Sequence, residues 1–257
     1  MEKLTKLVLS RFNQLGLTTR DNKKQNMIIQ MGESLGLHVN STEVEDMGIY
    51  MTHKDESIND VPEIIFVSHF DLVYPFEKGF KEHRVFDLFE NGDISGALDN
   101  TITNAALLEA VSQNGGLPKG VALFFSNGEE SGMWGVNNFF HNSREIETFD
   151  RIKNETFFIN LDVTNDQYEQ NISIEYDCKI VLKKELDLLN SNELRLGVQY
   201  VRYADDMSVI LGKGMQGYSA CLPTIGNCHS YKSTTTIDKI QEYTLFLTSR
   251  MNKGNFM

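Results

Sequence analysis

The chain has 257 residues, 40% of them apolar, so it can bury a full hydrophobic core while staying within the size of one domain. Its 36 acidic residues outnumber its 24 basic residues, which gives a formal net charge of −12, and no basic run is longer than a pair. This balance argues against binding to nucleic acid or to an anionic membrane surface. We expect a single catalytic domain over residues 1–257.

Cysteine usage and the first residues favour a cytoplasmic protein. The three cysteines, Cys178, Cys221 and Cys228, form no CxxC motif, and their odd number predicts no disulfide framework. The N-terminal segment is interrupted by Arg11 before the apolar core of a signal peptide would be complete. No stretch approaches the ~20 apolar residues that a membrane helix needs.

The first third of the chain predicts two amphipathic helices followed by three strands. The helices are expected at residues 4–15 and 22–35, and the strands at 38–44, 47–52 and 63–67. The last strand is almost continuously apolar, which is typical of a strand buried on both faces of a sheet.

The rest of the chain continues as an alternation of helices and strands. Residues 75–96 predict a polar loop, and residues 105–111 predict a buried helix. Further strands are expected at 121–125, 156–161, 172–176, 197–201 and 218–222, and further helices at 206–212 and 237–251.

Metal-ligand side chains recur at the ends of these apolar strands. His69 and Asp71 follow the strand at 63–67, Glu129 and Glu130 follow the next strand, and Asp162 follows the third; Asp99 precedes the buried helix and His229 lies in a loop flanked by glycine. Strand ends that share one edge of a sheet are where open α/β folds bind ligands. Imidazole and carboxylate groups together can hold two divalent cations, as aminopeptidases do.

Each of these residues also has an ordinary explanation when taken alone. An HxD triplet is commonly a surface accident, a Glu-Glu pair commonly lies in a solvated loop, and Asp99 before a helix is commonly an N-cap. His229 alone is compatible with a loop histidine. The conjunction of all of them in order along the chain favours a two-metal hydrolase.

Five segments carry a resemblance to a known superfamily. The series VSHFD, GALDN, SNGEESGMWG, NLD and CHSYKSTTTID resembles the co-catalytic di-zinc exopeptidases, the superfamily that contains metallopeptidase families 20, 28 and 42. The resemblance covers the chain from about Ile64 to the C-terminal helix. It implies a three-layer α/β/α sandwich with a mixed, mostly parallel central sheet.

The resemblance also implies a ligand set. His69 and Asp162 would bind one zinc ion, Glu130 and His229 would bind the other, and Asp99 would bridge both. Zinc is the expected metal, with cobalt or manganese as alternatives, because sites with nitrogen and oxygen donors accept several first-row ions.

Two further residues take catalytic roles by the same resemblance. Glu129 would be the general base that takes a proton from the water bridging the two ions, and Asp71 would orient His69. The family often has a cis peptide bond after its bridging aspartate, which here would join Asp99 and Asn100.

The spacing between motifs indicates the subfamily. Relatives with a lid or dimerisation domain insert it between the HxD motif and the bridging aspartate, or between the last aspartate and the last histidine. Those intervals, 71–99 and 162–229, are short here, so the chain is most similar to a family 28 aminopeptidase without a lid. The chain departs from many relatives in the residues after Asp99, which are Asn-Thr-Ile-Thr where many relatives have smaller side chains. Its CHSY segment is similar to the corresponding segment of the other subfamilies.

We therefore predict an aminopeptidase that removes N-terminal residues from short peptides. A carboxypeptidase or an N-acyl-amino-acid amidohydrolase of the same superfamily is the first alternative, and a non-catalytic binding scaffold is the second. The expected partner is a small peptide or aminoacyl substrate, with no nucleic acid and no membrane; the sequence does not indicate an oligomeric state.

Several other polar and aromatic residues carry weaker signals. Asp205 and Asp206 are expected either near the substrate or at a helix N-cap, and Trp134 is expected in the core. Tyr203 and Tyr231 are candidates for the pocket wall, and Cys228 is set aside as a ligand because the nitrogen and oxygen set is complete without it. The remaining histidines, His38, His53, His83 and His141, have no partner ligands nearby in the sequence.

Overall fold

The protein is described by a computed structural model. It describes residues 3–16, 21–40, 48–57, 60–72, 86–142, 146–165, 170–175, 196–199 and 205–252.

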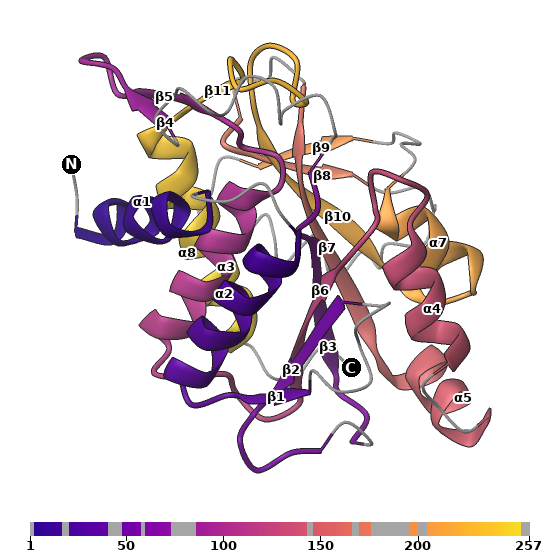
Figure 1. The fold of residues 1–257 in the computed structure, drawn as a ribbon. Helices are drawn as coiled ribbons and strands as arrows, with labels where there is room; N and C mark the ends of the chain where they lie inside the picture. Colours follow the sequence, from indigo (N-terminus) through magenta and orange to yellow (C-terminus); the bar gives the residue numbers. More distant parts are fainter. Residues whose placement is uncertain are drawn as a thin grey trace.

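An eight-stranded mixed sheet forms the middle of the molecule (Figure 1). Its order is β1-β2-β6-β3-β7-β10-β8-β9. The four central strands, β6, β3, β7 and β10, run parallel to one another, whereas β2 and β8 pair antiparallel with β6 and β10. The bounds are β1 His38–Asn40, β2 Gly48–Thr52, β3 Ile64–His69, β6 Val121–Ser126, β7 Phe157–Thr164, β8 Ile172–Glu175, β9 Leu196–Gln199 and β10 Gln216–Pro223.

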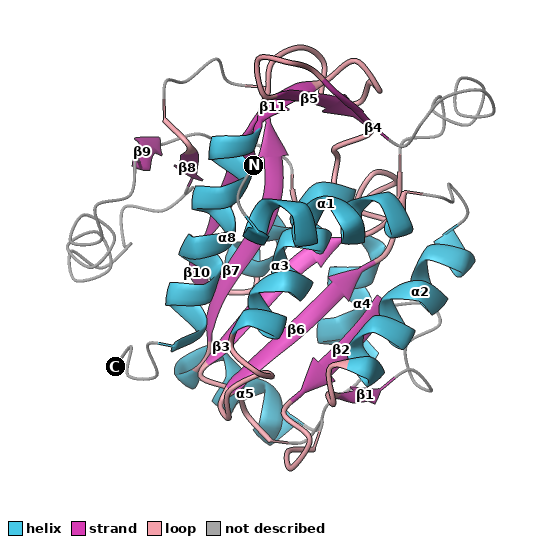
Figure 2. Ribbon diagram, turned by 90° about the vertical axis from the view of Figure 1, so that its left-hand side faces the viewer, coloured by secondary structure: helices cyan, strands magenta, loops and turns pink. Residues whose placement is uncertain are grey.

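Helices cover both faces of this sheet. One face is covered by α1 (Lys3–Leu15), α2 (Asp21–Ser34), α3 (Thr101–Gln113) and α8 (Ile237–Asn252), which face the viewer in Figure 2. The other face is covered by α4 (Trp134–Asn142), α5 (Ile146–Glu155) and α7 (Asp206–Gly212). The predicted three-layer α/β/α sandwich is confirmed.

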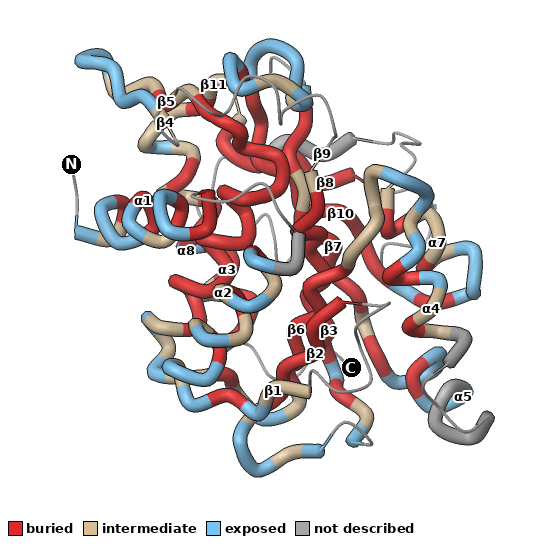
Figure 3. Tube along the Cα trace, in the orientation of Figure 1, coloured by how far each residue is buried: buried red, intermediate tan, exposed pale blue. Residues whose placement is uncertain are grey.

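The central strands are buried on both faces, as their apolar runs predict. All six residues of β3 are buried, and so are all six of β6 (Figure 3). Ile64 and Phe66 belong to the core cluster under α1, α3 and α8, while Ile65 and Val67 belong to the cluster under α4 and α7. Successive side chains of the strand therefore pack against opposite helix layers. Polar side chains that could bind a ligand are thus expected at the strand ends.

The segment predicted as a loop at residues 75–96 contains two strands. β4 (Phe86–Leu88) and β5 (Asp93–Gly96) form an antiparallel hairpin, and β11 (Thr234–Thr236) adds to β5. These strands are three or four residues long, and one partner comes from far along the chain, so local periodicity does not show them. Helices α4 and α5 were likewise not predicted, although Val136, Phe139 and Phe140 in α4 and Ile146, Phe149 and Ile152 in α5 are spaced as on one face of a helix.

The other predicted elements occur with shifted ends. β3 extends to His69, so this histidine is the last residue of the strand and does not follow it, and Asp162 lies within β7. Helix α3 begins at Thr101, four residues before the predicted start. Within the described part of the chain, the helices are all too short or too polar to cross a membrane.

Candidate metal centre

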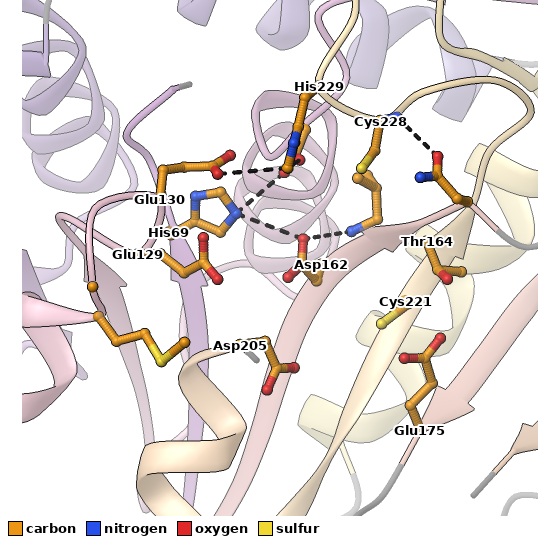
Figure 4. Close-up of a pocket in the computed structure, with 15 residues that line it drawn as sticks. His69, Glu129, Glu130, Asp162, Thr164, Glu175, Asp205, Cys221, Cys228 and His229 are labelled. Carbon is orange, nitrogen blue, oxygen red and sulfur yellow. Dashed lines mark hydrogen bonds and ion pairs between the residues drawn. The ribbon is translucent and has the colours of Figure 1, made fainter. Parts of the chain in front are cut away.

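The candidate ligands converge at the carboxyl edge of the central strands. His69 ends β3, Asp162 lies two residues before the end of β7, and Glu129 and Glu130 follow β6. Because these three strands are parallel neighbours, their carboxyl ends share one edge of the sheet. Figure 4 shows their side chains around one cavity, together with His229 from the loop between β10 and β11.

The ligand atoms form two groups that share Asp99. In the first group, Nε2 of His69 lies 3.2 Å from Oδ1 of Asp99 and 3.6 Å from Oδ1 of Asp162. In the second group, Nε2 of His229 lies 3.4 Å from Oδ2 of Asp99 and 3.5 Å from Oε2 of Glu130. Asp99 therefore offers one oxygen to each group, which is the arrangement that a bridging carboxylate needs.

The electrostatics of these residues fit a pair of divalent cations. Oδ1 of Asp99 is buried and has no hydrogen-bond partner. Burial, together with the neighbouring Asp99, raises the pKa of Glu130 to about 8, and burial raises the pKa of Asp162 to about 6. Among the described residues that line the cavity there is no lysine or arginine. Bound cations would supply the positive charge that these buried carboxylates lack.

Asp71 contacts the candidate ligand His69 and the loop that carries Glu129 and Glu130. Its Oδ1 lies 3.5 Å from Nδ1 of His69, so the other ring nitrogen, Nε2, faces the ligand group. Its carboxylate also accepts the backbone N–H groups of Glu129, at 3.2 Å, and of Glu130, at 3.1 Å. The sequence predicted the contact with His69; the two backbone contacts, which fix the Glu129–Glu130 loop, were missed.

The pKa values of His69 and Asp71 reflect this contact. Burial lowers the pKa of His69, but the close carboxylates of Asp162, Asp71 and Asp99 outweigh burial and raise it well above its usual value. Burial raises the pKa of Asp71, but the contacts with His69 and the two backbone N–H groups lower it overall. Asp71 is therefore a stable anion beside the histidine.

Glu129 lines the same cavity without belonging to either ligand group. The loop that carries it turns at Gly128, whose φ of 74° is a left-handed conformation that favours glycine. Burial raises the pKa of Glu129 to about 9, and nearby carboxylates add to the effect. At this pKa the carboxyl group is protonated at neutral pH, and bound cations would lower the pKa so that the group could accept a proton.

The first turn of α3 ties two strand ends together. The peptide bond between Asp99 and Asn100 is cis, as predicted. Nδ2 of Asn100 donates to the carbonyl of Leu161, at 2.6 Å, and Nδ2 of Asn104 donates to the carbonyl of His69, at 2.8 Å. Asn100 stands at the N-cap position but makes no side-chain cap. The larger polar residues after Asp99 thus hold β7 and β3 where they deliver their ligands.

The cavity has a volume of about 620 Å³ and extends beyond the ligand groups. Its further wall includes Asp205, Glu175 and Cys221. Asp205 is the N-cap of α7, accepting from the N–H of Ser208 at 3.1 Å, which confirms that alternative, and it also lines the cavity. Glu175 and Cys221 were missed; the signal for Glu175 was a carboxylate at the end of a strand that is otherwise buried.

Other candidates lie away from the cavity. Trp134 is 58% exposed, so its expected place in the core is wrong; its indole N–H donates to the carbonyl of Ser131 on the surface. Tyr231 is exposed and does not line the cavity, and Asp206 is buried and accepts a hydrogen bond from Ser126. Tyr203, His83 and the side chain of His141 lie outside the described residues. His38 contacts the carbonyl of Glu56, and His53 accepts from the N–H of Asp55.

Comparison with protein families shows the family of the chain. The model of peptidase family M28 matches residues 49–241, which include all seven candidate residues. The chain belongs to peptidase family M28. This M28 protein is a metallo-exopeptidase, in agreement with the enzyme class predicted from the motifs.

Solved structures share the fold at low sequence identity. An aminopeptidase from the archaeon Desulfurococcus kamchatkensis has a TM-score of 0.72 at 11% identity, over 98% of this chain and 96% of its own. The TET1 peptidase of Pyrococcus horikoshii, which can assemble into a tetrahedron or a large octahedral shell, has a TM-score of 0.70 at 10% identity, over 97% and 99%. A zinc aminopeptidase from Bacillus subtilis has a TM-score of 0.54 at 15% identity, over 79% and 49%. No curated protein matches the chain.

Proposed function

We propose that this M28 protein is an aminopeptidase that removes N-terminal residues from short peptides with the aid of two divalent metal ions. The observation that carries the proposal is the shared carboxylate of Asp99, with one oxygen 3.2 Å from His69 and the other 3.4 Å from His229. Zinc is the proposed metal, since imidazole and carboxylate donors suit it and a structural neighbour is a zinc aminopeptidase.

In this proposal the chain supplies two incomplete coordination shells. His69, Asp162 and Asp99 would hold the first ion, and Glu130, His229 and Asp99 would hold the second. Such ions, when bound, polarise a substrate carbonyl and lower the pKa of water.

Glu129 is the proposed proton carrier. Its carboxyl group lines the cavity beside the two ligand groups, and the hydrogen bonds of the loop to Asp71 fix its position. Glu129 would take a proton from the attacking water and deliver it to the leaving amine. Asp71 would act only through its neighbours, by orienting His69 and by anchoring the loop.

The charge of the cavity favours a substrate with a free amino group. The described lining residues include six carboxylates and no lysine or arginine, and three of the six, Glu129, Asp205 and Glu175, lie outside the ligand groups. An N-terminal ammonium group would meet complementary charge here, whereas a C-terminal carboxylate would be repelled. This is the specific reason to prefer an aminopeptidase to a carboxypeptidase.

The domain organisation remains part of the proposal. We propose one catalytic domain over residues 1–257, without an inserted lid or dimerisation domain.

Hydrolysis of matched substrates tests the proposal. Purified protein, loaded with zinc or cobalt, is offered aminoacyl p-nitroanilides and tripeptides with free and with N-acetylated termini. Turnover of the free-amine substrates alone supports an aminopeptidase. Turnover of the acetylated substrates alone would indicate an amidohydrolase, and no turnover with two ions bound would favour a binding scaffold.

A further inference from the structure

Cys228 stands next to the second ligand group, although the nitrogen and oxygen donors seemed complete without it. Its sulfur, a carboxylate oxygen of Asp99 and a ring nitrogen of His229 all lie within 4.8 Å of one another. Figure 4 shows Cys228 and His229 side by side in the loop after β10, with both side chains directed into the cavity.

The backbone holds Cys228 in this position. Its N–H donates to Oδ1 of Asn165, at 2.8 Å, and Asn165 follows the end of β7 directly. The loop is thereby attached to the strand that carries Asp162. The thiol is therefore placed beside the centre by a hydrogen bond of the fold and not only by its neighbour His229.

A second observation points to a ligand at this place. Asp99 is 4% exposed; its Oδ1, 3.2 Å from Nε2 of His69, is buried without a hydrogen-bond partner, and its Oδ2 lies 3.4 Å from Nε2 of His229. A buried carboxylate that lacks a donor and faces two imidazoles and a thiol is arranged as a ligand of a cation. Among protein side chains, imidazole, carboxylate and thiolate together are the set that binds zinc.

We propose that Cys228 is a fourth protein ligand of the second metal position, through its sulfur. The inference rests on the proposed two-metal centre and adds to it a donor that the predicted ligand set does not contain. The sulfur of Cys228 would join Asp99 and His229, the two residues with which it forms a group within 4.8 Å.

The sulfur also determines which metals the second position accepts. Thiolate is a soft donor that favours zinc and cadmium, whereas manganese and magnesium prefer oxygen. The second position should therefore discriminate against manganese more strongly than the first.

Cys221 is a matched control within the same cavity. It also lines the cavity, but it belongs to β10 and lies next to Glu175, away from His229 (Figure 4). It does not belong to the group formed by Asp99, Cys228 and His229. Cys178 lies outside the described residues, so its replacement by serine serves as a further control.

Electronic absorption of the cobalt-loaded protein tests the proposal independently of activity. Thiolate bound to Co²⁺ gives an intense charge-transfer band in the near ultraviolet, which oxygen and nitrogen ligands do not give. We expect this band in the wild-type protein, in Cys221→Ser and in Cys178→Ser, and its loss in Cys228→Ser while two cobalt ions per chain remain bound. Cys228→Ser should also lose the preference for cadmium over manganese in a competition experiment.

The outcomes separate this proposal from the proposed function. Two bound cobalt ions without the band in the wild-type protein would overturn the role of Cys228 and leave the aminopeptidase intact. A band that persists in Cys228→Ser and disappears in Cys178→Ser would assign the sulfur to another residue. Failure of the wild-type protein to bind cobalt would contradict the two-metal centre itself, and the role of Cys228 with it.

Discussion

The two proposed metal positions are built in different ways. The first takes His69 and Asp162 from β3 and β7, which are hydrogen-bonded neighbours in the sheet, and His69 is only 3% exposed. The second takes Glu130 and His229 from two loops, and the side chain of His229 is 46% exposed. Asp99, at the start of α3, belongs to both.

Pairing between strands positions the candidate ligands of the first metal position, whereas loops position those of the second. Strand pairing sets the spacing of the first pair of ligands, so the first position is formed together with the core. The loops of the second position are attached by hydrogen bonds from Glu129 and Glu130 to Asp71 and from Cys228 to Asn165. The first position therefore has the more rigid geometry, and the second, with Cys228, has a further proposed donor in a more adaptable geometry.

Loss of the shared ligand should have the largest effect. Asp99→Ala removes a donor from both positions, so we expect fewer than one ion per chain and no measurable hydrolysis. Elemental analysis and hydrolysis of a free-amine substrate measure this. Asp87→Ala, at an exposed acidic residue of β4, is the control and should keep both ions. Two ions in Asp99→Ala would contradict the bridging role.

Loss of one histidine should distinguish the two positions. His69→Ala leaves the first position with two carboxylates, so it should retain about one ion and lose hydrolysis. His229→Ala leaves Asp99, Glu130 and Cys228, so it should retain more metal and more activity than His69→Ala. His38→Ala, at a distant exposed histidine, is the control. Equal losses in the two variants would remove the distinction between sheet-held and loop-held positions.

Replacement of the proposed base should affect turnover but not metal content. Glu129→Gln keeps the shape of the loop and removes proton transfer, so kcat should fall by about 10² to 10⁴ while both ions stay bound. Elemental analysis alongside steady-state kinetics measures both quantities, with the exposed Glu90→Gln as control. Parental kcat in Glu129→Gln would exclude this residue as the base.

Replacement of Asp71 should have a smaller effect on metal affinity and activity. This residue contacts His69 of the first position and the backbone of Glu130 in the second. Asp71→Asn loses the anionic contact with His69 and weakens the acceptor of the two loop N–H groups, so metal affinity or activity should fall roughly 10- to 100-fold. Zinc affinity from chelator competition is the readout. An unchanged zinc affinity would show that the His69 ring and the Glu129–Glu130 loop keep their positions without this carboxylate.

Metal affinity should rise with pH. The metal-free pKa of Glu130, about 8, and that of Asp162, about 6, mean that zinc must displace protons below these values. Affinity should therefore increase from pH 6 to pH 8 by up to about tenfold per unit for each proton released, and the proton that His69 holds through its raised pKa adds to this dependence. Calorimetric titration in buffers of different ionisation enthalpy counts the released protons. An affinity that is flat with pH would contradict the buried, protonated carboxylates.

The parts of the site that the sequence could predict are those carried by local pattern. The apolar strand that ends at His69 and the one that includes Asp162 show their ligands directly, and the motif resemblance predicted the cis peptide bond after Asp99. The family match to residues 49–241 agrees with that resemblance.

The parts that the sequence did not predict depend on contacts between distant residues. The hydrogen bonds of Asn100 to Leu161 and of Asn104 to His69 join segments 61 and 35 positions apart. The small sheet requires β11 to pair with β5, and Trp134 is exposed because its loop turns it outward beside Gly128. None of these pairings leaves a periodic signal in the chain.

Diffraction from zinc-soaked crystals at the zinc absorption edge tests the central claim most directly. The account predicts two anomalous peaks, one on each side of the Asp99 carboxylate, the first contacted by His69 and the second by His229. A single peak, or two peaks that do not share Asp99, would contradict a two-metal centre bridged by this residue.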